Sequence, residues 1–368
     1  MSARAGDRYT LAAEDLPALF HALRADGRVV VGPTPRDGAI TYAPIAGPES
    51  LPVGLSDEQS PGRYRLIERD DEAMFAYNLG PESWKKLLHP SRLTLWRARK
   101  EGAAFHVEQA PAPPRYAILG ARACELAAIA VQDKVFLGSG VVDPHYASRR
   151  EGLLIVAVQC GQAAATCFCP SMGSGPRLGG GFDLALTELL APHRFVVEVG
   201  SEAGAALCAS LPLVPAGADA AAPEQAAERA EAQIHRRMSV EGLRERLVEA
   251  VSSPRWDKVA ERCLGCANCT MVCPTCFCTN VHDLTDLSGA TERVREWDSC
   301  FNTEFSHLHG GSVRVSLGAR YRQWLTHKLS SWWDQFGSSG CVGCGRCIAW
   351  CPAGIDIVAE ANAFKEPL

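Results

Sequence analysis

Two short cysteine-rich runs near the end of this 368-residue chain constrain its fold more than any other feature. The first run reads CLGCANCTMVCP from residue 263, and the second reads CVGCGRCIAWCP from residue 341. Both have the spacing C-x2-C-x2-C-x3-C-P, in which three thiolates on a tight loop face one cubane and the fourth points away. Zinc ribbons use separate C-x2-C pairs instead. The sequence therefore predicts a ferredoxin-type segment with two [4Fe–4S] clusters.

The spacing also predicts which cysteines share a cluster. In two-cluster ferredoxins the fourth cysteine of each run binds the cluster of the other run. Cluster 1 is therefore expected to use Cys263, Cys266, Cys269 and Cys351. Cluster 2 is expected to use Cys341, Cys344, Cys347 and Cys273. The glycines at 265, 343 and 345 are expected to let backbone amides approach the clusters.

The composition restricts the partners and the compartment. The formal net charge is −5, whereas binding to nucleic acid needs a concentrated basic surface. Charged residues interrupt every apolar run well before about 18 residues, so no membrane span is expected. Twelve of the sixteen cysteines fall into tight local groups, which suits metal ligation in a reducing cytoplasm better than disulfides. We expect a cytoplasmic metalloprotein that binds no nucleic acid.

The predicted fold class is an α/β N-terminal domain plus a mostly helical, two-cluster ferredoxin-type C-terminal domain. In the first part, short apolar runs at 29–31, 116–119, 153–158 and 195–199 are strand-like, whereas Ala123–Phe136 and 182–190 are helix-like. The expected domains are 1–200 (α/β), 201–254 (an Ala-rich linker at 201–222 and an amphipathic helix at 224–251) and 255–368 (the dicluster domain, with a helix at 320–336).

Four further cysteines are predicted to meet at one edge of the N-terminal sheet. Cys124 begins a helix after one strand signal, and Cys160 follows the next strand signal. The carboxyl ends of parallel strands share an edge, where α/β proteins bind ligands. The following loop completes the candidate set, which is Cys124, Cys160, Cys167 and Cys169. These predict a third [4Fe–4S] cluster, with Arg122 near enough to offset its charge; inert buried thiols are the alternative.

Four cysteines remain outside these sets. Thr-Cys-Phe-Cys occurs at 166–169 and again at 275–278, and the second copy supplies Cys276 and Cys278, with Cys300 further along. We interpret these three as structural thiols, the alternatives being a role in the cluster environment or ligation of another metal. Cys208 is interpreted as incidental.

The chain resembles a known family over roughly residues 115–360. The resemblance is to the iron–sulfur beta subunit of cytoplasmic NAD(P)-linked [NiFe] hydrogenases, or sulfhydrogenases, and it rests on CLGCANCTMVCPTCFCTNVHDLTDL, WDSCFN, HGGSVR, YRQWLTHKL and CVGCGRCIAWCPAGIDI. GARACELAAI, DPHYASRR, CFCPSMGSGP and GFDLALTEL are similar to that family's first domain. Where the family usually has Arg-Pro-Cys-Asp, this chain has Arg122-Ala123-Cys124-Glu125, which keeps the cysteine. More distantly, the chain resembles the iron–sulfur A subunit of anaerobic sulfite reductase.

The resemblance implies a non-catalytic electron-transfer subunit of an oxidoreductase complex. Its [4Fe–4S] clusters would relay electrons between an FAD- and NAD(P)-binding reductase subunit and the small and large subunits of a [NiFe] hydrogenase. The chain itself has no Rossmann fingerprint, P-loop or C-x-x-C-H haem motif, and no catalytic residue is assigned. Two alternatives stay open: the same module serving an anaerobic sulfite reductase, and a stand-alone iron–sulfur redox sensor, which would normally add a DNA-binding or effector module.

Overall fold

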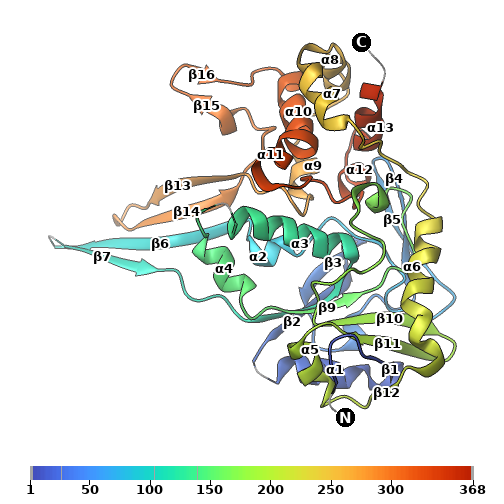
Figure 1. Cartoon of the computed structure of the whole chain (residues 1–368). Coiled ribbons are helices and arrows are strands. Elements are labelled where there is room, and N and C mark those ends of the chain that lie inside the picture. Colours follow the sequence, from blue (N-terminus) through green and yellow to red (C-terminus); the bar gives the residue numbers. More distant parts are fainter. Residues whose placement is uncertain (1–2, 26, 103, 139, 366–368) are drawn as a thin grey trace.

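The structure is a computed structural model that describes residues 3–25, 27–102, 104–138 and 140–365. A sheet-rich N-terminal part lies at the bottom of Figure 1, and a group of short helices that carries both cysteine runs lies at the top. The N-terminus and the C-terminus lie at opposite ends of the molecule (Figure 1). The N-terminal part, which was predicted to be α/β, is rich in sheet.

An eight-stranded mixed sheet forms the base of the described part of the chain, in the order β12-β1-β11-β10-β9-β8-β2-β3. The four neighbours β10, β9, β8 and β2 run parallel, and the other pairs are antiparallel. The strands are β1 (Arg8–Ala12), β2 (Val29–Arg36), β3 (Ala39–Pro44), β8 (Tyr116–Ala121), β9 (Leu154–Val158), β10 (Leu184–Leu190), β11 (His193–Val199) and β12 (Val214–Pro215).

The central strands are apolar along their whole length because both faces of the sheet are covered. On β8, Leu119 packs in one core with Phe20, whereas the adjacent Ile118 packs in the opposite core with Ile129. Strands covered on both faces read as continuous apolar runs instead of alternating ones. The helices of this part are α1 (Leu16–Arg24), α2 (Lys85–Leu88), α3 (Ala123–Phe136), α4 (Pro144–Arg150) and α5 (Glu202–Cys208).

A four-stranded antiparallel sheet projects from the body as an arm (Figure 1). Its order is β13-β14-β6-β7, and the seam between β14 and β6 runs from the pair Thr291–Ala98 to the pair Glu296–Arg92. The arm therefore joins the cysteine-rich C-terminal segment to the N-terminal region. The strands are β6 (Arg92–Glu101), β7 (Ala104–Gln109), β13 (Thr279–Thr285) and β14 (Thr291–Trp297).

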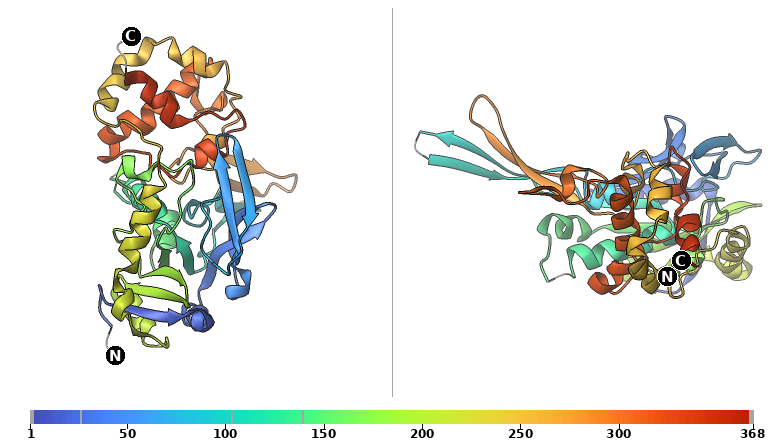
Figure 2. Two further views of the ribbon diagram at one scale, coloured as in Figure 1. Left: turned by 90° about the vertical axis from the view of Figure 1, so that its right-hand side faces the viewer. Right: turned by 90° about the horizontal axis from the view of Figure 1, so that it is seen from above.

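A second hairpin connects the two parts of the molecule. It is formed by β4 (Leu55–Ser60) and β5 (Arg63–Glu68), which reach from the sheet-rich part up to the helices in the left view of Figure 2. At its tip the N–H of Gly62 donates to the carbonyl of Ile348 over 3.0 Å. The ring of Tyr64 stacks on that of Trp350 at 5.1 Å. The hairpin thus contacts the second cysteine run directly.

The C-terminal segment packs around a core of its own. Trp256, Trp324 and Ile357 lie in this core, and Phe168 enters it from an N-terminal loop. No helix in the described ranges is long and apolar enough to cross a membrane. The segment also contains the small hairpin β15 (His307–Leu308) and β16 (Gly311–Ser312). The helices after the first sheet are α6 (Ala222–Ala232), α7 (Leu243–Glu249), α8 (Arg255–Ala260), α9 (Asn268–Met271), α10 (Leu317–Thr326), α11 (Trp332–Phe336), α12 (Arg346–Ala349) and α13 (Ile357–Asn362).

Four predicted elements differ from the structure. Within residues 182–190, predicted as a helix, Leu184–Leu190 form strand β10, so that prediction is wrong. Residues 201–222, predicted as a linker, contain α5 and β12, and β12 extends the sheet beside β1. The helix predicted at 224–251 is present as α6 and α7, with a break between them. The helix predicted at 320–336 is present as α10 and α11, joined by a π-helical turn at His327–Ser331.

Candidate metal centres

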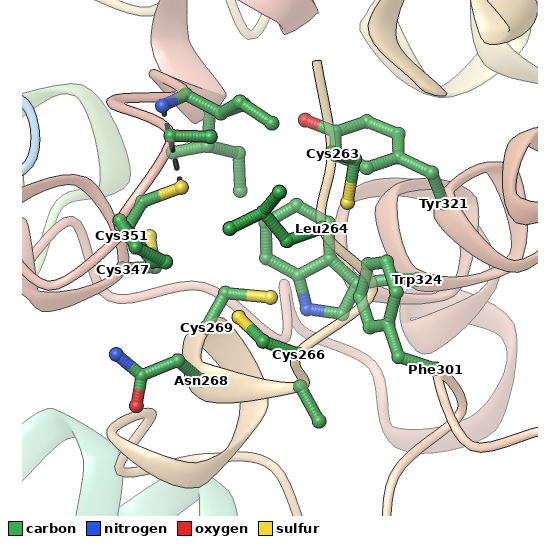
Figure 3. Close-up of a pocket in the computed structure, with 15 residues that line it drawn as sticks. Cys263, Leu264, Cys266, Asn268, Cys269, Phe301, Tyr321, Trp324, Cys347 and Cys351 are labelled. Carbon is green, nitrogen blue, oxygen red and sulfur yellow. Dashed lines mark hydrogen bonds between the residues drawn. The ribbon is translucent and has the colours of Figure 1, made fainter. Parts of the chain in front are cut away.

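The four cysteines predicted for cluster 1 line one cavity, which Figure 3 shows in close-up. Cys263 and Cys266 lie on the loop before α9, Cys269 lies on α9, and Cys351 follows α12. In Figure 3 the four sulfur atoms point toward the middle of the cavity. The fold thus brings three cysteines of the first run to the fourth cysteine of the second run, which is the predicted set. That these sulfurs bind iron stays a prediction.

Backbone geometry at this cavity supplies donors to the sulfur atoms. The N–H of Gly265 donates to Sγ of Cys263 over 3.4 Å, and the N–H of Ile355 donates to Sγ of Cys351 over 3.3 Å. Gly265 and Ala267 have φ of 63° and 62°, so the loop makes two left-handed turns. The left-handed conformation costs a residue such as alanine about 1–2 kcal/mol. Such strain is common at binding sites, where the surrounding structure imposes it.

Two buried donors show that the cavity suits an iron–sulfur cluster. Oη of Tyr321 and Nε1 of Trp324 are buried, line the cavity, and have no hydrogen-bond partner in the described part of the chain. A buried donor left unsatisfied costs about 1–3 kcal/mol. The sulfides and thiolates of a cluster accept hydrogen bonds, so both donors fit one. Cys266 is exposed and Leu264 is 68% exposed, so this side of the cavity reaches the protein surface.

The cysteines predicted for cluster 2 form a second group. Burial raises the pKa of the Cys347 thiol well above its usual value, and the neighbouring Cys341, Cys344 and Cys273 raise it further. The N–H of Gly343 donates to Sγ of Cys341 over 3.5 Å. Cys347 also borders the cavity of the first group, so the two groups are adjacent. The predicted set is therefore assembled here as well, again with one cysteine supplied by the other run.

A buried lysine contacts this second group. Nζ of Lys328, a residue only 3% exposed, donates to Sγ of Cys273 over 3.3 Å, to Oγ1 of Thr275 over 3.1 Å and to the carbonyl of Gly340 over 3.0 Å. A hydrogen bond with Cys276, together with the Lys328 ammonium, holds the pKa of Cys273 well below its usual value. A low thiol pKa favours the thiolate, which is the form that binds metal.

The four N-terminal cysteines also gather. Cys124 lies in the first turn of α3 and Cys160 lies two residues after β9, which pairs in parallel with β8. Burial raises the pKa of all four thiols, that of Cys167 to about 12, and Cys160 and Cys167 raise that of Cys169 further. The predicted convergence at the carboxyl edge of the sheet is therefore present. Whether the four bind a third cluster stays a prediction.

The side chain of Arg122 lies beside this third group, as expected from the sequence. Arg122 is only 3% exposed, and its guanidinium lowers the pKa of Cys160 against the larger, opposing effect of burial. Nη1 donates to the carbonyl of Gln159 over 3.1 Å, and Nη2 donates to the carbonyl of Phe75 over 2.6 Å. These bonds hold a positive charge in place where four thiolates would need one.

The second and third groups are packed against each other without space for another side chain. The N–H of Phe168 donates to the carbonyl of Gly343 over 2.9 Å. A Cβ on Gly343 would lie 2.6 Å from Cα of Cys169, and a Cβ on Gly345 would lie 2.4 Å from the carbonyl oxygen of Thr166. Both glycines also have positive φ. The lack of a side chain at both glycines therefore allows this contact between loops, in addition to the predicted approach of the Gly343 backbone to a cysteine sulfur.

A buried ion pair spans the same contact. Nη2 of Arg346 donates to Oε1 of Glu125 over 2.6 Å, and the two side chains are 0% and 1% exposed. Glu125 also accepts from Oη of Tyr42 and Nε1 of Trp84. Arg346 lies between two cysteines of the second group, and Glu125 follows Cys124 of the third. The pair therefore fixes the two groups relative to each other.

Sequence reasoning missed several residues at these sites. Lys328, Tyr321 and Trp324 all belong to the helix predicted at 320–336, to which no role at a metal centre was assigned. The aromatic pair spaced three residues apart was the available signal. All sixteen cysteines are free, and Cys208 lies in the core of the main sheet. No three His, Cys, Asp or Glu side chains in the described ranges are arranged to hold a single metal ion.

Comparisons with known proteins bear on the segment that carries the two cysteine runs. A family described as a 4Fe-4S dicluster domain matches residues 262–355, which include both cysteine runs. The sulfhydrogenase 2 subunit beta of Pyrococcus furiosus is 29% identical over 362 residues, which cover 97% of this chain and 98% of that protein. No solved structure matches. The resemblance to the hydrogenase beta subunits is thereby confirmed, and the chain carries an iron–sulfur dicluster domain.

Proposed function

We propose that this chain is the electron-transfer subunit of a cytoplasmic, NAD(P)-linked [NiFe] hydrogenase. The observation that carries the proposal is the continuous arrangement of the three cysteine groups. Cys344 of the second group raises the pKa of Cys124 and Cys169 in the third, and Cys347 of the second group borders the cavity of the first. The similarity to a sulfhydrogenase beta subunit along almost the whole chain supports the choice of complex.

The clusters supply one-electron storage at each site when they are bound. The chain's own residues hold them, shield them from water and donate hydrogen bonds to their sulfurs. Backbone N–H groups of Gly265, Gly343 and Ile355 already point at cysteine sulfurs. Hydrogen bonds, net charge and solvent exposure set the reduction potential of such a cluster. The buried Lys328 and Arg122 would therefore make their sites easier to reduce than sites without a cation.

The partners we propose are an FAD- and NAD(P)-binding reductase subunit and the small and large subunits of a [NiFe] hydrogenase. The first cysteine group is suited to exchange electrons with a partner because its loop reaches the surface. Besides Leu264, the apolar side chains of Val313 and Val315 are exposed on the segment that leads into α10. Leu317, at the start of that helix, would lie 3.2 Å from a Cβ on Gly265. Exposed apolar residues grouped in this way are typical of an interaction surface.

The test is anaerobic purification of the tagged chain from its own cells with its bound subunits. We expect flavin-containing and nickel-containing partners, at least two [4Fe–4S] clusters per copy of this chain, and NAD(P)H oxidation coupled to hydrogen formation. Double substitution Cys266→Ser/Cys269→Ser should abolish the coupled reaction. It should leave hydrogen formation from reduced viologen and NAD(P)H oxidation by a dye intact, because those reactions bypass this chain.

The matched control is Cys208→Ser, which changes a buried cysteine that no site uses and should leave the coupled rate unchanged. The proposal fails if the double variant keeps the coupled rate of the wild type. Copurification with a sirohaem subunit in place of a nickel protein would instead assign the chain to a sulfite reductase.

A further inference from the structure

The three remaining cysteines lie together at the base of the arm. Cys276 and Cys278 precede β13, and Cys300 follows β14, the strand paired with it. The hydrogen bonding between β13 and β14 continues one residue beyond the two strands, since the N–H of Asp298 donates to the carbonyl of Cys278 over 2.8 Å. Cys278 and Asp298 are therefore opposite each other, and residues in that relation have Cβ atoms about 4.5–5.5 Å apart. The arm thus brings two distant parts of the sequence to one place.

The segment that carries the first two cysteines packs against aromatic rings and buried lysines. The ring of Phe277 contacts those of Trp332 at 5.3 Å and Phe336 at 5.9 Å, so it is turned into an aromatic group. Two buried lysines lie beside the same segment, since Nζ of Lys85 donates to the carbonyl of Cys276 and Nζ of Lys328 donates to Oγ1 of Thr275.

These lysines lack a conventional counter-charge. Lys85 is 5% exposed; its Nζ donates to the carbonyl of Cys276 over 3.1 Å and lies 3.7 Å above the ring centre of Trp297. Lys328 contacts Cys273, Thr275 and Gly340. In the described part of the chain, neither ammonium has a carboxylate within ion-pair distance. A buried charge is very costly unless it is paired. Cluster 2 would supply negative charge near Lys328 and, through Cys273, near Lys85, but Nζ of Lys85 is hydrogen-bonded to Cys276, which that cluster does not use.

The repeated tetrapeptide gives an independent argument. Its first copy, at 166–169, buries Phe168 in the C-terminal core and contributes Cys167 and Cys169 to the third group. Its second copy, at 275–278, packs the partly buried Phe277 against a different core, which includes Trp332. Both copies also contact the second cysteine run, through the bond from Phe168 to Gly343 and through Oγ1 of Thr275, which donates to the carbonyl of Gly340 over 2.6 Å. Each copy therefore places two cysteines, with a phenylalanine between them, beside the second cysteine run.

We propose that Cys276, Cys278 and Cys300, with the Asp298 carboxylate as fourth ligand, bind an additional iron–sulfur cluster whose negative charge is balanced by Lys85 and Lys328. Its ligands differ from those of the three groups described above, and it adjoins the second group, because Cys276 is hydrogen-bonded to Cys273. It does not depend on which complex the chain serves, although it does require a chain that is loaded with iron–sulfur clusters.

The first experiment uses the wild-type chain in its native, anaerobically purified complex. A cryo-EM map, or anomalous diffraction at the iron edge, should show metal between the sulfurs of Cys276, Cys278 and Cys300. A map with iron at the two ferredoxin runs and none at these three sulfurs overturns this inference and leaves the proposed function intact. A single zinc ion at the site, identified from its own absorption edge, also overturns it.

The second experiment compares metal content between variants. Cys276→Ser/Cys278→Ser/Cys300→Ser should lose one cluster's worth of iron and sulfide per chain, and Cys208→Ser should lose none. The triple variant should keep the electron paramagnetic resonance signals of the ferredoxin-run clusters. Loss of a ferredoxin-run signal instead, with the remaining iron unchanged, would mean that Cys276 serves cluster 2 and that the additional site does not exist. If the triple variant does not fold, the wild-type map decides alone.

Discussion

Replacing Arg346 with methionine should weaken the attachment between the second and third cysteine groups. The change leaves the Glu125 carboxylate, whose side chain is 1% exposed, without the guanidinium that donates to it over 2.6 Å. Removing one partner of a buried ion pair costs about 3–5 kcal/mol, because the other charge stays buried and unpaired. An exposed pair is worth only about 0–1 kcal/mol. The matched control is therefore Arg92→Met, since Arg92 is 53% exposed and pairs with Glu292 at 2.7 Å.

The assay is the rate at which visible absorbance is lost in anaerobic guanidinium chloride. A rate is the suitable quantity because proteins with bound cofactors seldom unfold in two states. If the ion pair is already broken in the transition state for unfolding, the variant loses stability only in its folded state, and the unfolding rate rises by the full free-energy difference. An energy of 3–5 kcal/mol then corresponds to roughly a 100- to 5,000-fold faster loss, at about 1.4 kcal/mol for each factor of ten.

A double variant tests whether the effect arises from the pair itself. Glu125→Gln/Arg346→Met removes both charges and should be less destabilised than the sum of the single changes, by roughly 0.5–3 kcal/mol. The reasoning is refuted if Arg346→Met loses its absorbance no faster than Arg92→Met. Strict additivity of the two single changes would equally show that Arg346 and Glu125 do not stabilise each other.

Three further predictions concern pH, ligand assignment and potential. Burial, reinforced by Arg295, lowers the pKa of His89 to about 3, so this imidazole is neutral in the folded state and takes up a proton only on unfolding below pH of about 6.5. The free energy of unfolding should therefore be about 2 kcal/mol lower at pH 5 than at pH 7. In His89→Phe this loss should be absent when the rate of absorbance decay is compared between the two pH values. A variant with the same pH dependence as the wild type would contradict the prediction. Cys273→Ser should eliminate the resonance of cluster 2, and Cys351→Ser that of cluster 1, whereas the reverse outcome would show that each run closes its own cubane. Lys328→Met should shift the potential of cluster 2 to more negative values in a redox titration, with Lys328→Arg near the wild type, because a nearby cation stabilises the reduced cluster; an unchanged potential would exclude that role.

The sites were predictable from sequence where the determining information is local. The spacing within each cysteine run specifies a loop, and that loop is present in both places. Cys124 and Cys160 were assigned to one sheet edge because each follows a short apolar run, and both runs are parallel strands. The side chains of residues 184–186 alternate between the two cores, yet the segment was predicted as a helix. A short apolar segment is compatible with the residue spacing of a helix and with that of a strand. The segment is a strand because it pairs in antiparallel with β11.

The charged residues at the sites could not be predicted because their partners lie far away in sequence. Arg346 and Glu125 are separated by 221 positions, and Lys328 and Cys273 by 55. A lysine or arginine on a helix normally faces solvent, so the sequence gives no sign that these two are buried. Their positions are set by packing between elements, which the local pattern does not encode. The cysteines indicated how many clusters to expect, but not which positively charged side chains lie beside each cysteine group.

The seam between β6 and β14 has a consequence for how the chain is made. Ala98 pairs with Thr291, so one edge of β6 leaves the ribosome about 190 residues before its partner. At about 5–20 residues per second, this corresponds to roughly 10–40 s of synthesis. During that interval an open strand edge is a template for pairing with other chains. The first cysteine run is made shortly before β14, so the arm closes only after the first ligands have emerged. Completion of the N-terminal half therefore waits for the metal-binding segment, and a truncated nascent chain would be left with an aggregation-prone edge.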